Sequence, residues 1–348
     1  MSEIKGVKIY ALSNNKNDFV RKSRKVKNFS YYPKAANETE WVSNLNEELK
    51  KFEIDVIMPI DEYGILTLIK NKSILLQNSK LVLLPELNTF NTANNKGLLS
   101  KHLQSFQIPA PKTILYNTTD DLSTLPLEFP VLMKPFEGGG GGKGIILLKD
   151  SLSVKNFFSS NKVEFPFLIQ SYIQGYDIDC SVLCKNGKIL AFTIQKGILQ
   201  GDSEFEPNIG LEFLHEKELY IVVKKLVKSL NWSGIAHIDM RYDVNDKTFK
   251  VIEINPRFWE TTEASEIAGV NFPYLYCLER LDIAFGKPEY RNIKFMDLRG
   301  IGKTFRNNKL FLFKIKFLLR NTPIKYYLKD PLPFLNLIRD KIRSLLPG

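Results

Sequence analysis

The sequence predicts an α/β unit followed by α+β units, and three patterns along the chain support this prediction. Residues 1–90 alternate strand-like and helix-like stretches, as in a βαβ unit with a parallel sheet. Residues 131–148 hold two short apolar stretches around five consecutive glycines, which predicts a strand, a loop and a second strand. Residues 235–255 alternate polar and apolar side chains on both sides of a short turn, which predicts a strand hairpin.

Length and composition are those of a globular protein with more than one structural unit. The chain has 348 residues, 44% hydrophobic and 25% charged, and a single core rarely grows beyond about 250–300 residues. No apolar run approaches the roughly 18 residues of a membrane span. The first 15 residues lack the features of a signal peptide, so we expect a cytoplasmic protein. Cys180, Cys184 and Cys277 show no CxxC spacing, and we expect reduced structural thiols.

In the first unit, strands are expected at 7–10, 54–58 and 81–84. A helix is expected between the first two, where Trp41, Leu45 and Leu49 recur at helical spacing. The polar residues 88–95 predict the linker that leaves this unit. A short helix at 97–106 should follow, because the prolines of 108–111 end its pattern.

The second half of the chain is expected to be rich in strands. They are predicted at 167–172, 178–183, 189–194, 235–241 and 249–255. Asn186 and Gly187 predict a tight hairpin between two of them. An amphipathic helix is predicted at 216–230.

The patterns divide the chain into four segments. We expect an N-terminal βαβ domain at 1–90 and a small unit with the glycine-rich loop at 91–170. A larger unit with a metal site should occupy 171–295, and a basic, aromatic segment 296–348.

The glycine-rich loop is a candidate phosphate-binding loop. It follows directly on a strand that carries Lys134, and glycines let backbone N–H groups approach phosphate oxygens closely. The spacing does not match a Walker A loop, because Glu137 and Gly144 stand at two of its required positions. A flexible hinge, with Lys134 as a solvent-facing lysine of an edge strand, is the alternative.

The predicted hairpin at 235–255 is a candidate metal site. His237, Asp239 and Arg241 share one face of the first strand, and Glu253 and Asn255 share one face of the second. If the strands pair, oxygen atoms from both converge, and Mg²⁺ prefers such ligands. The alternative is a half-exposed hairpin whose polar face is only solvated.

In this order, the features resemble the ATP-grasp superfamily, which includes D-alanine:D-alanine ligase, biotin carboxylase and the large subunit of carbamoyl phosphate synthetase. The resemblance covers roughly residues 1–290 and includes the segment from Glu253 to Trp259 (EINPRFW), similar to a group of short carboxylate–amine ligases. It implies a βαβ domain followed by two α+β units that clasp ATP.

The resemblance also implies roles for particular residues. Lys96 and Lys134 would hold ATP phosphates, and a flap would close over them. The flap residues are Gly138, Gly139, Gly140, Gly141, Gly142 and Lys143. Gln170, Tyr172 and Ile173 would face adenine, and Asp177 the ribose, although the family more often has Glu where this chain has Gln170 and Asp177.

Catalytic and metal-binding roles are implied in the same way. Asp239, Glu253 and Asn255 would bind two Mg²⁺ ions, for which Mn²⁺ is an alternative. Arg257 would steady the acyl phosphate or tetrahedral intermediate, and Lys196 would lie near the γ-phosphate. The activity implied is an ATP-dependent ligase that couples a small-molecule carboxylate to an amine through an acyl phosphate.

Other polar residues are weaker candidates. His237 shares the metal-side face and is a candidate for substrate contact, whereas His102 and His215 are expected to be surface or capping residues. The remaining candidates for the substrate pocket are Asp61, Glu62, Glu204, Glu206, Glu260 and Glu263, with solvated acids as the alternative.

The C-terminal segment is strongly basic. Residues 303–348 contain eleven Lys or Arg against two Asp, a net charge of +9. Together with its aromatic residues, this suggests peripheral contact with an anionic membrane, at the inner membrane surface, or with a polyanion. The alternative is a helical tail packed on the catalytic body, interrupted by Pro323, Pro331 and Pro333. No nucleic-acid partner is expected, and the oligomeric state is left open.

Three further functions remain alternatives at this point. One is an ATP-dependent carboxylase, although the chain has no biotin-carrier attachment sequence. Another is an acyl kinase. The third is a nucleotide-binding protein without turnover at a membrane surface, against which the retained polar set argues.

Overall fold

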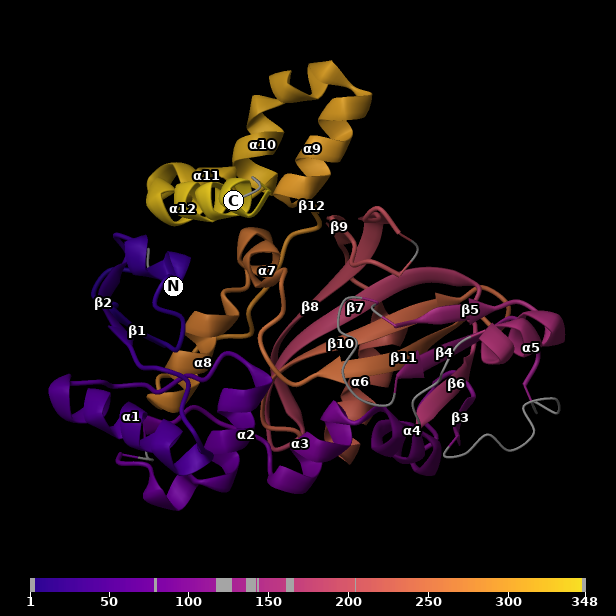
Figure 1. The fold of residues 1–348 in the computed structure, drawn as a ribbon, viewed down its shortest axis with the longest axis horizontal. Helices are drawn as coiled ribbons and strands as arrows, with labels where there is room; N and C mark the ends of the chain where they lie inside the picture. Colours follow the sequence, from indigo (N-terminus) through magenta and orange to yellow (C-terminus); the bar gives the residue numbers. More distant parts are fainter. Residues whose placement is uncertain are drawn as a thin grey trace.

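The computed structural model describes residues 4–77, 80–116, 127–135, 142, 144–160, 166–203 and 205–345, with side chains to residue 339. These residues form a parallel strand pair, a four-stranded sheet and a six-stranded sheet. Helices surround the sheets, and a group of C-terminal helices stands apart from them (Figure 1). Cys180, Cys184 and Cys277 are free thiols, as expected.

The N-terminal unit has the expected parallel strand pairing, although no α-helix lies between its two paired strands. β1 (Ile9–Ser13) pairs in parallel with β2 (Val26–Tyr31), a strand that the sequence prediction missed. α1 (Glu38–Lys51) confirms the predicted helix, and its buried Val42 and Leu49 pack on α2 (Glu62–Lys70) and its surroundings. The strands predicted at 54–58 and 81–84 are reduced to one parallel bridge between Ile57 and Leu81.

The predicted linker at 88–95 is wrong. This stretch forms α3 (Leu87–Asn94), because Phe90 and Ala93, three residues apart, are both buried against the body. The helix predicted next is confirmed as α4 (Lys96–Ser105), whose first turn is capped by the Asn95 side chain.

The four-stranded sheet is antiparallel and has the order β3-β6-β4-β5. Its strands are β3 (Thr113–Tyr116), β4 (Val131–Pro135), β5 (Ile146–Leu148) and β6 (Phe167–Ser171). β4 pairs with β5, which confirms the two predicted strands. α5 (Ser151–Ser160) packs on this sheet through Val154.

The six-stranded sheet is antiparallel and has the order β11-β10-β7-β8-β9-β12. Its strands are β7 (Gly175–Lys185), β8 (Lys188–Leu199), β9 (Gly210–Phe213), β10 (Gly234–Asp243), β11 (Thr248–Asn255) and β12 (Lys294–Met296). The β7–β8 hairpin turns at Asn186 and Gly187, whose φ angles of +48° and +73° confirm the predicted tight turn.

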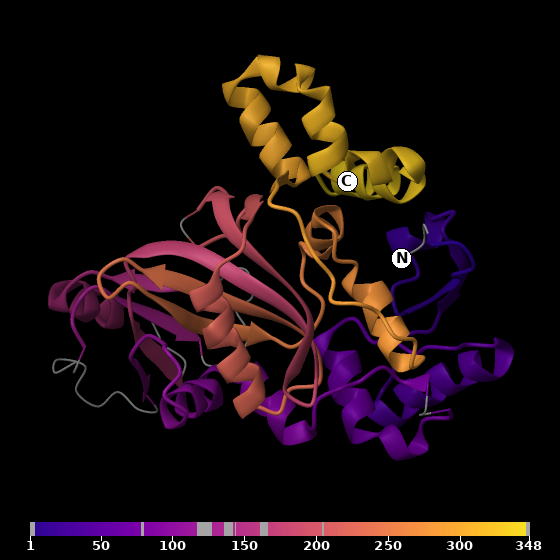
Figure 2. The same ribbon diagram turned by 180° about the vertical axis from the view of Figure 1, so that it is seen from behind.

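Helices cover both faces of this sheet. α6 (Lys217–Ser229), the predicted amphipathic helix, covers one face (Figure 2). Its Val223 and Leu226 belong to the core on that face. On the other face, α7 (Thr262–Ala268) and α8 (Phe272–Arg280) cover one end. The rest of that second face forms the floor of a cleft.

The C-terminal segment is a set of short helices. They are α9 (Leu298–Asn307), the 3₁₀ turn η6 (Lys309–Phe313), α10 (Ile315–Asn321), α11 (Ile324–Lys329) and α12 (Pro331–Leu345). The breaks at Pro323 and Pro331 confirm that no single amphipathic helix forms. Asp330 accepts a hydrogen bond from Ser23 and pairs with Arg24, which fastens this segment to the N-terminal unit. No described helix is long and apolar enough to cross a membrane.

Candidate functional site

A cleft of about 340 Å³ lies between the four-stranded and six-stranded sheets. β4 and β6 form one wall and supply Lys134 and Gln170. β7, β10 and β11 form the floor of the cleft, and Lys96 reaches in from the start of α4. Strand pairing sets the positions of the polar side chains, since alternate residues of each strand face the cleft.

Three oxygen-bearing side chains meet on β10 and β11. Asp239 pairs with Glu253, and His237 pairs with Asn255, in the antiparallel hairpin that the sequence predicted. The Asn255 Nδ2 donates to Asp239 Oδ2 at 3.0 Å. Two carboxylates and an amide are thereby held side by side at the floor of the cleft.

The two carboxylates differ in their pKa values. Burial, reinforced by the Asp239 charge, raises the pKa of Glu253 above its ordinary value. Burial also opposes ionisation of Asp239, but His237, together with the hydrogen bonds to Glu253 and Asn255, outweighs it and lowers the pKa of Asp239. A divalent cation between the two would relieve their repulsion, and the hard oxygen donors suit Mg²⁺. The residues present therefore fit the expected metal.

Two lysines bring positive charge to the same cleft. The Nζ of Lys96 lies 3.7 Å from a Glu253 carboxylate oxygen. The Nζ of Lys134 donates to Gln170 Oε1 at 2.8 Å, and Gln170 in turn donates to Thr113. Burial lowers the pKa of Lys134 to about 8, and the Glu253 carboxylate only partly opposes this. Lys134 is thus a buried amine that an anionic ligand would stabilise in its charged form.

The stretch after β6 is held in place by Arg241. Its guanidinium donates to the carbonyl oxygens of Ile173 and Gly175, at 2.8 and 3.0 Å, and pairs with the Asp177 carboxylate. The side chain also lies over the ring of Tyr172, 5.6 Å from its centroid. Tyr172, Ile173 and Asp177 all line the cleft, at the positions expected to face a nucleotide.

Arg257 lies at the end of the cleft next to the metal-ligand candidates. Its Nε donates to Glu62 of the N-terminal unit, and its Nη2 lies 3.3 Å from Asn255 Oδ1. Glu62 therefore contacts the site indirectly, as a partner of Arg257. Asp61 has a structural role, since its carboxylate caps α2 by accepting from the Gly64 N–H.

The expectation that Lys196 lies near the phosphates is wrong. Lys196 pairs across β7 with Ile178, which belongs to the core beneath α6, whereas its neighbour Gln195 pairs with Asp179 and lines the cleft. The Nζ of Lys196 lies 3.7 Å from the centroid of the Tyr176 ring. A shift of one residue along a strand changes the face, so Lys196 points away from the cleft.

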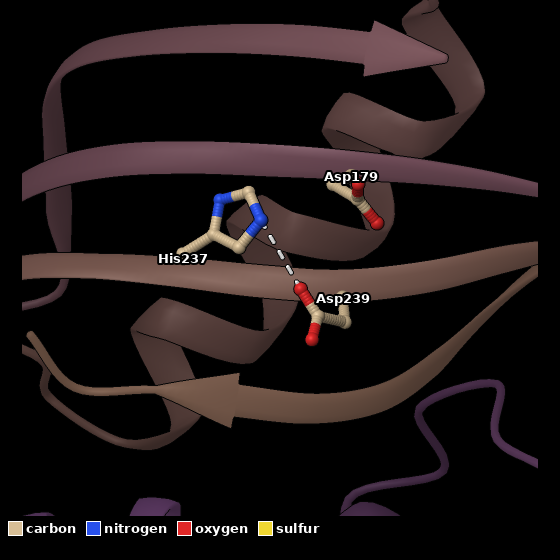
Figure 3. A group of neighbouring side chains, drawn as sticks. All are labelled: Asp179, His237 and Asp239. Carbon is tan, nitrogen blue, oxygen red and sulfur yellow. Dashed lines mark ion pairs between the residues drawn. The ribbon is translucent and has the colours of Figure 1, made fainter. Parts of the chain in front are cut away.

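Asp179 is a cleft residue that the sequence reasoning missed. Figure 3 shows it on β7, facing His237 and Asp239 of β10, and donor atoms of the three lie within 4.8 Å of one another. The His237 Nε2 lies 3.1 Å from Asp239, and burial together with the Asp239 charge raises the pKa of Asp179. The alternation of Asp177, Ile178 and Asp179 was the signal that could have identified it. The described residues therefore offer a second donor set that shares Asp239.

The imidazole of His237 is fixed from three sides. Its Nδ1 lies 2.9 Å from Ser181 Oγ, and its ring stacks on Trp259 at 5.4 Å and 15°. With Asp239 on the other nitrogen, the ring has a defined orientation in the cleft.

His102 and His215 lie outside the cleft, as expected, against Ser229 and Tyr290 respectively.

The structure describes only some of the predicted flap residues and acidic candidates, and only some of those line the cleft. Gly138, Gly139, Gly140, Gly141, Lys143 and Glu204 lie outside the described residues. Gly142 lines the cleft at φ +80°, and a Cβ there would meet the Phe205 carbonyl oxygen at 2.0 Å, so only glycine fits. Glu206 and Glu260 line the cleft, whereas Glu263 does not. Burial, with Asp297 nearby, raises the pKa of Glu263 to about 7.

Comparison with known proteins agrees with this geometry. Residues 93–262 match the family model of the ATP-grasp domain. The carbamoyl phosphate synthase large chain of Lachnoclostridium phytofermentans is 27% identical over 206 residues, which cover 56% of this chain and 19% of that protein. This chain thus spans about a fifth of the length of that relative.

Solved structures share the fold at lower identity. An L-amino acid ligase from Bacillus licheniformis has a TM-score of 0.57 and 17% identity, over 82% of this chain and 76% of that one. An N5-carboxyaminoimidazole synthetase from Staphylococcus aureus, solved with ADP, has a TM-score of 0.66 and 16% identity, over 87% and 80% of the two chains. At these identities the similarity shows the fold, which confirms the expected architecture.

Proposed function

Because residues 93–262 form an ATP-grasp domain, we propose that this chain is an ATP- and magnesium-dependent ligase that couples a carboxylate to an amine. The observation that carries the proposal is the convergence of opposite charges in one cleft. Lys96 and Lys134 supply cations suited to phosphates, and Asp239, Glu253 and Asn255 supply oxygen ligands suited to Mg²⁺. ATP and its metal need both sets within reach of each other.

ATP is proposed to bind between the two sheets. Lys96 and Lys134 would hold its phosphates, and the loop at 138–144 would close over them. Gln170, Tyr172 and Ile173 would contact the adenine, and Asp177 the ribose. The clamp that Arg241 forms on Ile173 and Asp177 supports this, because it fixes both groups before the nucleotide arrives.

The carboxylate is proposed to react at the metal end of the cleft. Magnesium bound there would neutralise charge on the β- and γ-phosphates, with two ions expected and Mn²⁺ as a substitute. A carboxylate oxygen attacks the γ-phosphorus, the bond to the β-γ bridging oxygen breaks, and ADP leaves. The amine then attacks the acyl phosphate carbonyl, and phosphate leaves. Arg257 would hold the transferred phosphate, and His237 would position the substrate.

Two other reaction types use the same fold. A carboxylase would take bicarbonate as its carboxylate, and an acyl kinase would stop at the acyl phosphate. The amine requirement of phosphate release separates both from the ligase. A nucleotide-binding protein without turnover would bind ATP and release nothing, and the complete set Lys96, Lys134, Asp239, Glu253 and Asn255 argues against it.

The test is ADP and phosphate release from ATP and Mg²⁺, across paired mixtures of amino acids, peptides and uronic acids with amines. Release that needs both a carboxylate and an amine, and that is lost in Glu253→Ala and Asn255→Ala, is the expected result. Release with bicarbonate alone would replace the ligase by a carboxylase. ATP binding without release under any mixture would contradict turnover.

We also propose a location and a further contact. ATP supply and reduced thiols favour the cytoplasm. The net charge of +9 over residues 303–348 favours contact with an anionic surface, at the inner face of the membrane, over contact with nucleic acid. Exposed apolar side chains in the same segment support a lipid surface rather than a simple polyanion.

A further inference from the structure

The connection between α9 and α10 combines exposed apolar side chains with cations, and we propose that it docks on an anionic lipid bilayer. Residues 306–316 are called the hairpin tip below. The proposal rests on the anionic-surface contact proposed for residues 303–348, and it names the contacting residues and the partner. In both ribbon views this connection projects beyond the rest of the molecule (Figures 1 and 2).

The hairpin tip exposes apolar side chains that its own core does not need. Phe311 is only 6% exposed and packs with Ile301 and Leu318, so the tip has a folded base. Around it, the large apolar side chains stand in solvent: Leu310 is 70% exposed, Leu312 43%, Phe313 79% and Ile315 57%. A cluster of exposed apolar side chains within one short segment marks an interaction site.

The charge around these side chains has one sign. Residues 298–329 contain nine Lys or Arg and no Asp or Glu. Within the tip, Arg306, Lys309, Lys314 and Lys316 are exposed, and none forms an ion pair in the part of the chain that the structure describes. Lys309 lies over the Phe305 ring at 4.4 Å, which keeps the cation beside apolar surface. The charge of the hairpin tip is therefore complementary to that of an anionic surface.

An anionic bilayer is the partner that uses both properties. Lipid phosphates attract the lysines, and the boundary of the acyl chains accepts Leu310, Phe313 and Ile315. A nucleic acid would use the lysines and leave the apolar side chains in water. A second copy of the chain would cover the apolar side chains but bring lysines against lysines.

Docking would orient the cleft as well as the tip. Within α9, just before the hairpin tip, the Lys303 Nζ donates to the carbonyl oxygens of Gln200 and Gly201, at 3.1 and 2.7 Å. The loop that follows places Phe205 and Asn208 on the edge of the cleft. A tip bound to a membrane would therefore hold this edge at a fixed distance from the lipid surface.

The experiment is co-sedimentation of the full chain with phosphatidylcholine vesicles, with and without phosphatidylglycerol, in the absence of ATP and substrates. Binding to the anionic vesicles is expected. Leu310→Ser with Phe313→Ser should weaken it at least about tenfold, and each of Lys309→Gln, Lys314→Gln and Lys316→Gln by up to about fivefold. The matched pair Leu152→Ser with Ile221→Ser, at 65% and 55% exposed positions of α5 and α6, should bind like the wild type.

A second readout reports the depth of insertion. Tryptophan emission of Phe313→Trp should shift to the blue on anionic vesicles and be quenched by brominated lipid, whereas Leu152→Trp should show neither change. Absence of vesicle binding, or full binding by the Leu310→Ser, Phe313→Ser variant with unchanged thermal unfolding, would overturn the proposal. So would a dimer in sedimentation velocity that this variant abolishes. Turnover is assayed separately, without lipid. The vesicle-binding result can therefore be interpreted even if the ligase assignment fails.

Discussion

Where the cleft lies over the six-stranded sheet, its two faces differ in character, although the same strands form both. On the α6 face, Cys180, Val182, Ile194 and Ile238 are at most 1% exposed. On the cleft face, the intervening positions carry Asp179, Gln195, His237 and Asp239. Chemistry and stability therefore lie on alternate residues of the same strands. Substitutions on the two faces should separate into losses of turnover and losses of folding.

The largest effect is expected on the cleft face, from Glu253→Gln. Removing one metal-ligand carboxylate should lower ATP turnover by at least about 10³-fold. The free energy of unfolding should stay level or rise slightly, because burial and the Asp239 charge already disfavour ionised Glu253. Steady-state ADP release and urea unfolding measure the two quantities. Glu212→Gln, in β9 opposite Lys196, is the matched control. Equal turnover in Glu253→Gln and Glu212→Gln would contradict the claim that the cleft face carries the catalytic residues.

On the opposite face, Leu226→Ala should lower the free energy of unfolding by about 2–5 kcal/mol. Leu226 is fully buried between α6 and the sheet, so its truncation leaves a cavity. ATP affinity of the folded fraction should remain within about twofold, since no cleft residue is changed. Urea unfolding and calorimetric ATP titration below the transition test this. A large loss of affinity without a loss of stability would contradict it.

The two lysines give a sharper pair. Lys134→Ala removes a buried cation from the cleft and should weaken ATP binding about 10- to 100-fold, the range for a charge-assisted hydrogen bond. Lys196→Ala, on the other face, should change ATP affinity less than about twofold. Both affinities are measured by calorimetry with Mg-ATP. A similar loss of ATP affinity in both variants would show that Lys196 contacts the phosphates after all.

The smallest effect is a pH dependence of ATP binding. The pKa of Lys134 is about 8 in the free protein, and bound phosphates should raise it. ATP affinity should therefore be level below pH 8 and fall above it, by at most about tenfold per pH unit. At pH 8.5, ATP titrations in buffers of different ionisation enthalpy should reveal net proton uptake. Lys134→Ala should abolish that uptake, and equal affinity at pH 7 and pH 9 would contradict the assignment.

Periodicity predicted α1, α4, α6 and most of the described strands, and tertiary packing decided other elements such as α3. Amphipathic α1 and α6 and the alternating strands β10 and β11 carry their burial pattern in the sequence itself. α3 does not, because five of its eight residues are Asn or Thr and only the contacts of Phe90 and Ala93 make it a helix. The division of the chain at residues 90, 170 and 295 stays a prediction.

The candidate site was predictable where one strand pair sets the geometry. Alternation puts Asp239 and Glu253 on the same polar face of the hairpin, and the pairing of the two strands sets them opposite each other. Alternation places Asp179 on the same face of β7 as Asp177, but its approach to Asp239 depends on the pairing of β7 with β10. Glu62 was a candidate by its position after a predicted strand, and its contact with Arg257 depends on the packing of the N-terminal unit. Lys196 was misplaced because the resemblance identifies only the segment that lies near the site. Successive side chains of a strand point to opposite faces, so a position one residue away lies on the wrong face. The roles of Asp239 and Glu253 as metal ligands remain predictions.

The pairing of β12 with β9 has a consequence for biosynthesis. Residues 210–213 are synthesised about 80 residues before their partner strand at 294–296. Until then β9 is an open edge on a nearly finished sheet, and open edges invite pairing with other chains. Nascent chains arrested before residue 294 should therefore aggregate more readily than chains arrested beyond residue 340, which sedimentation of released chains would measure. Correct assembly of this protein then depends on how quickly the ribosome delivers its last strand.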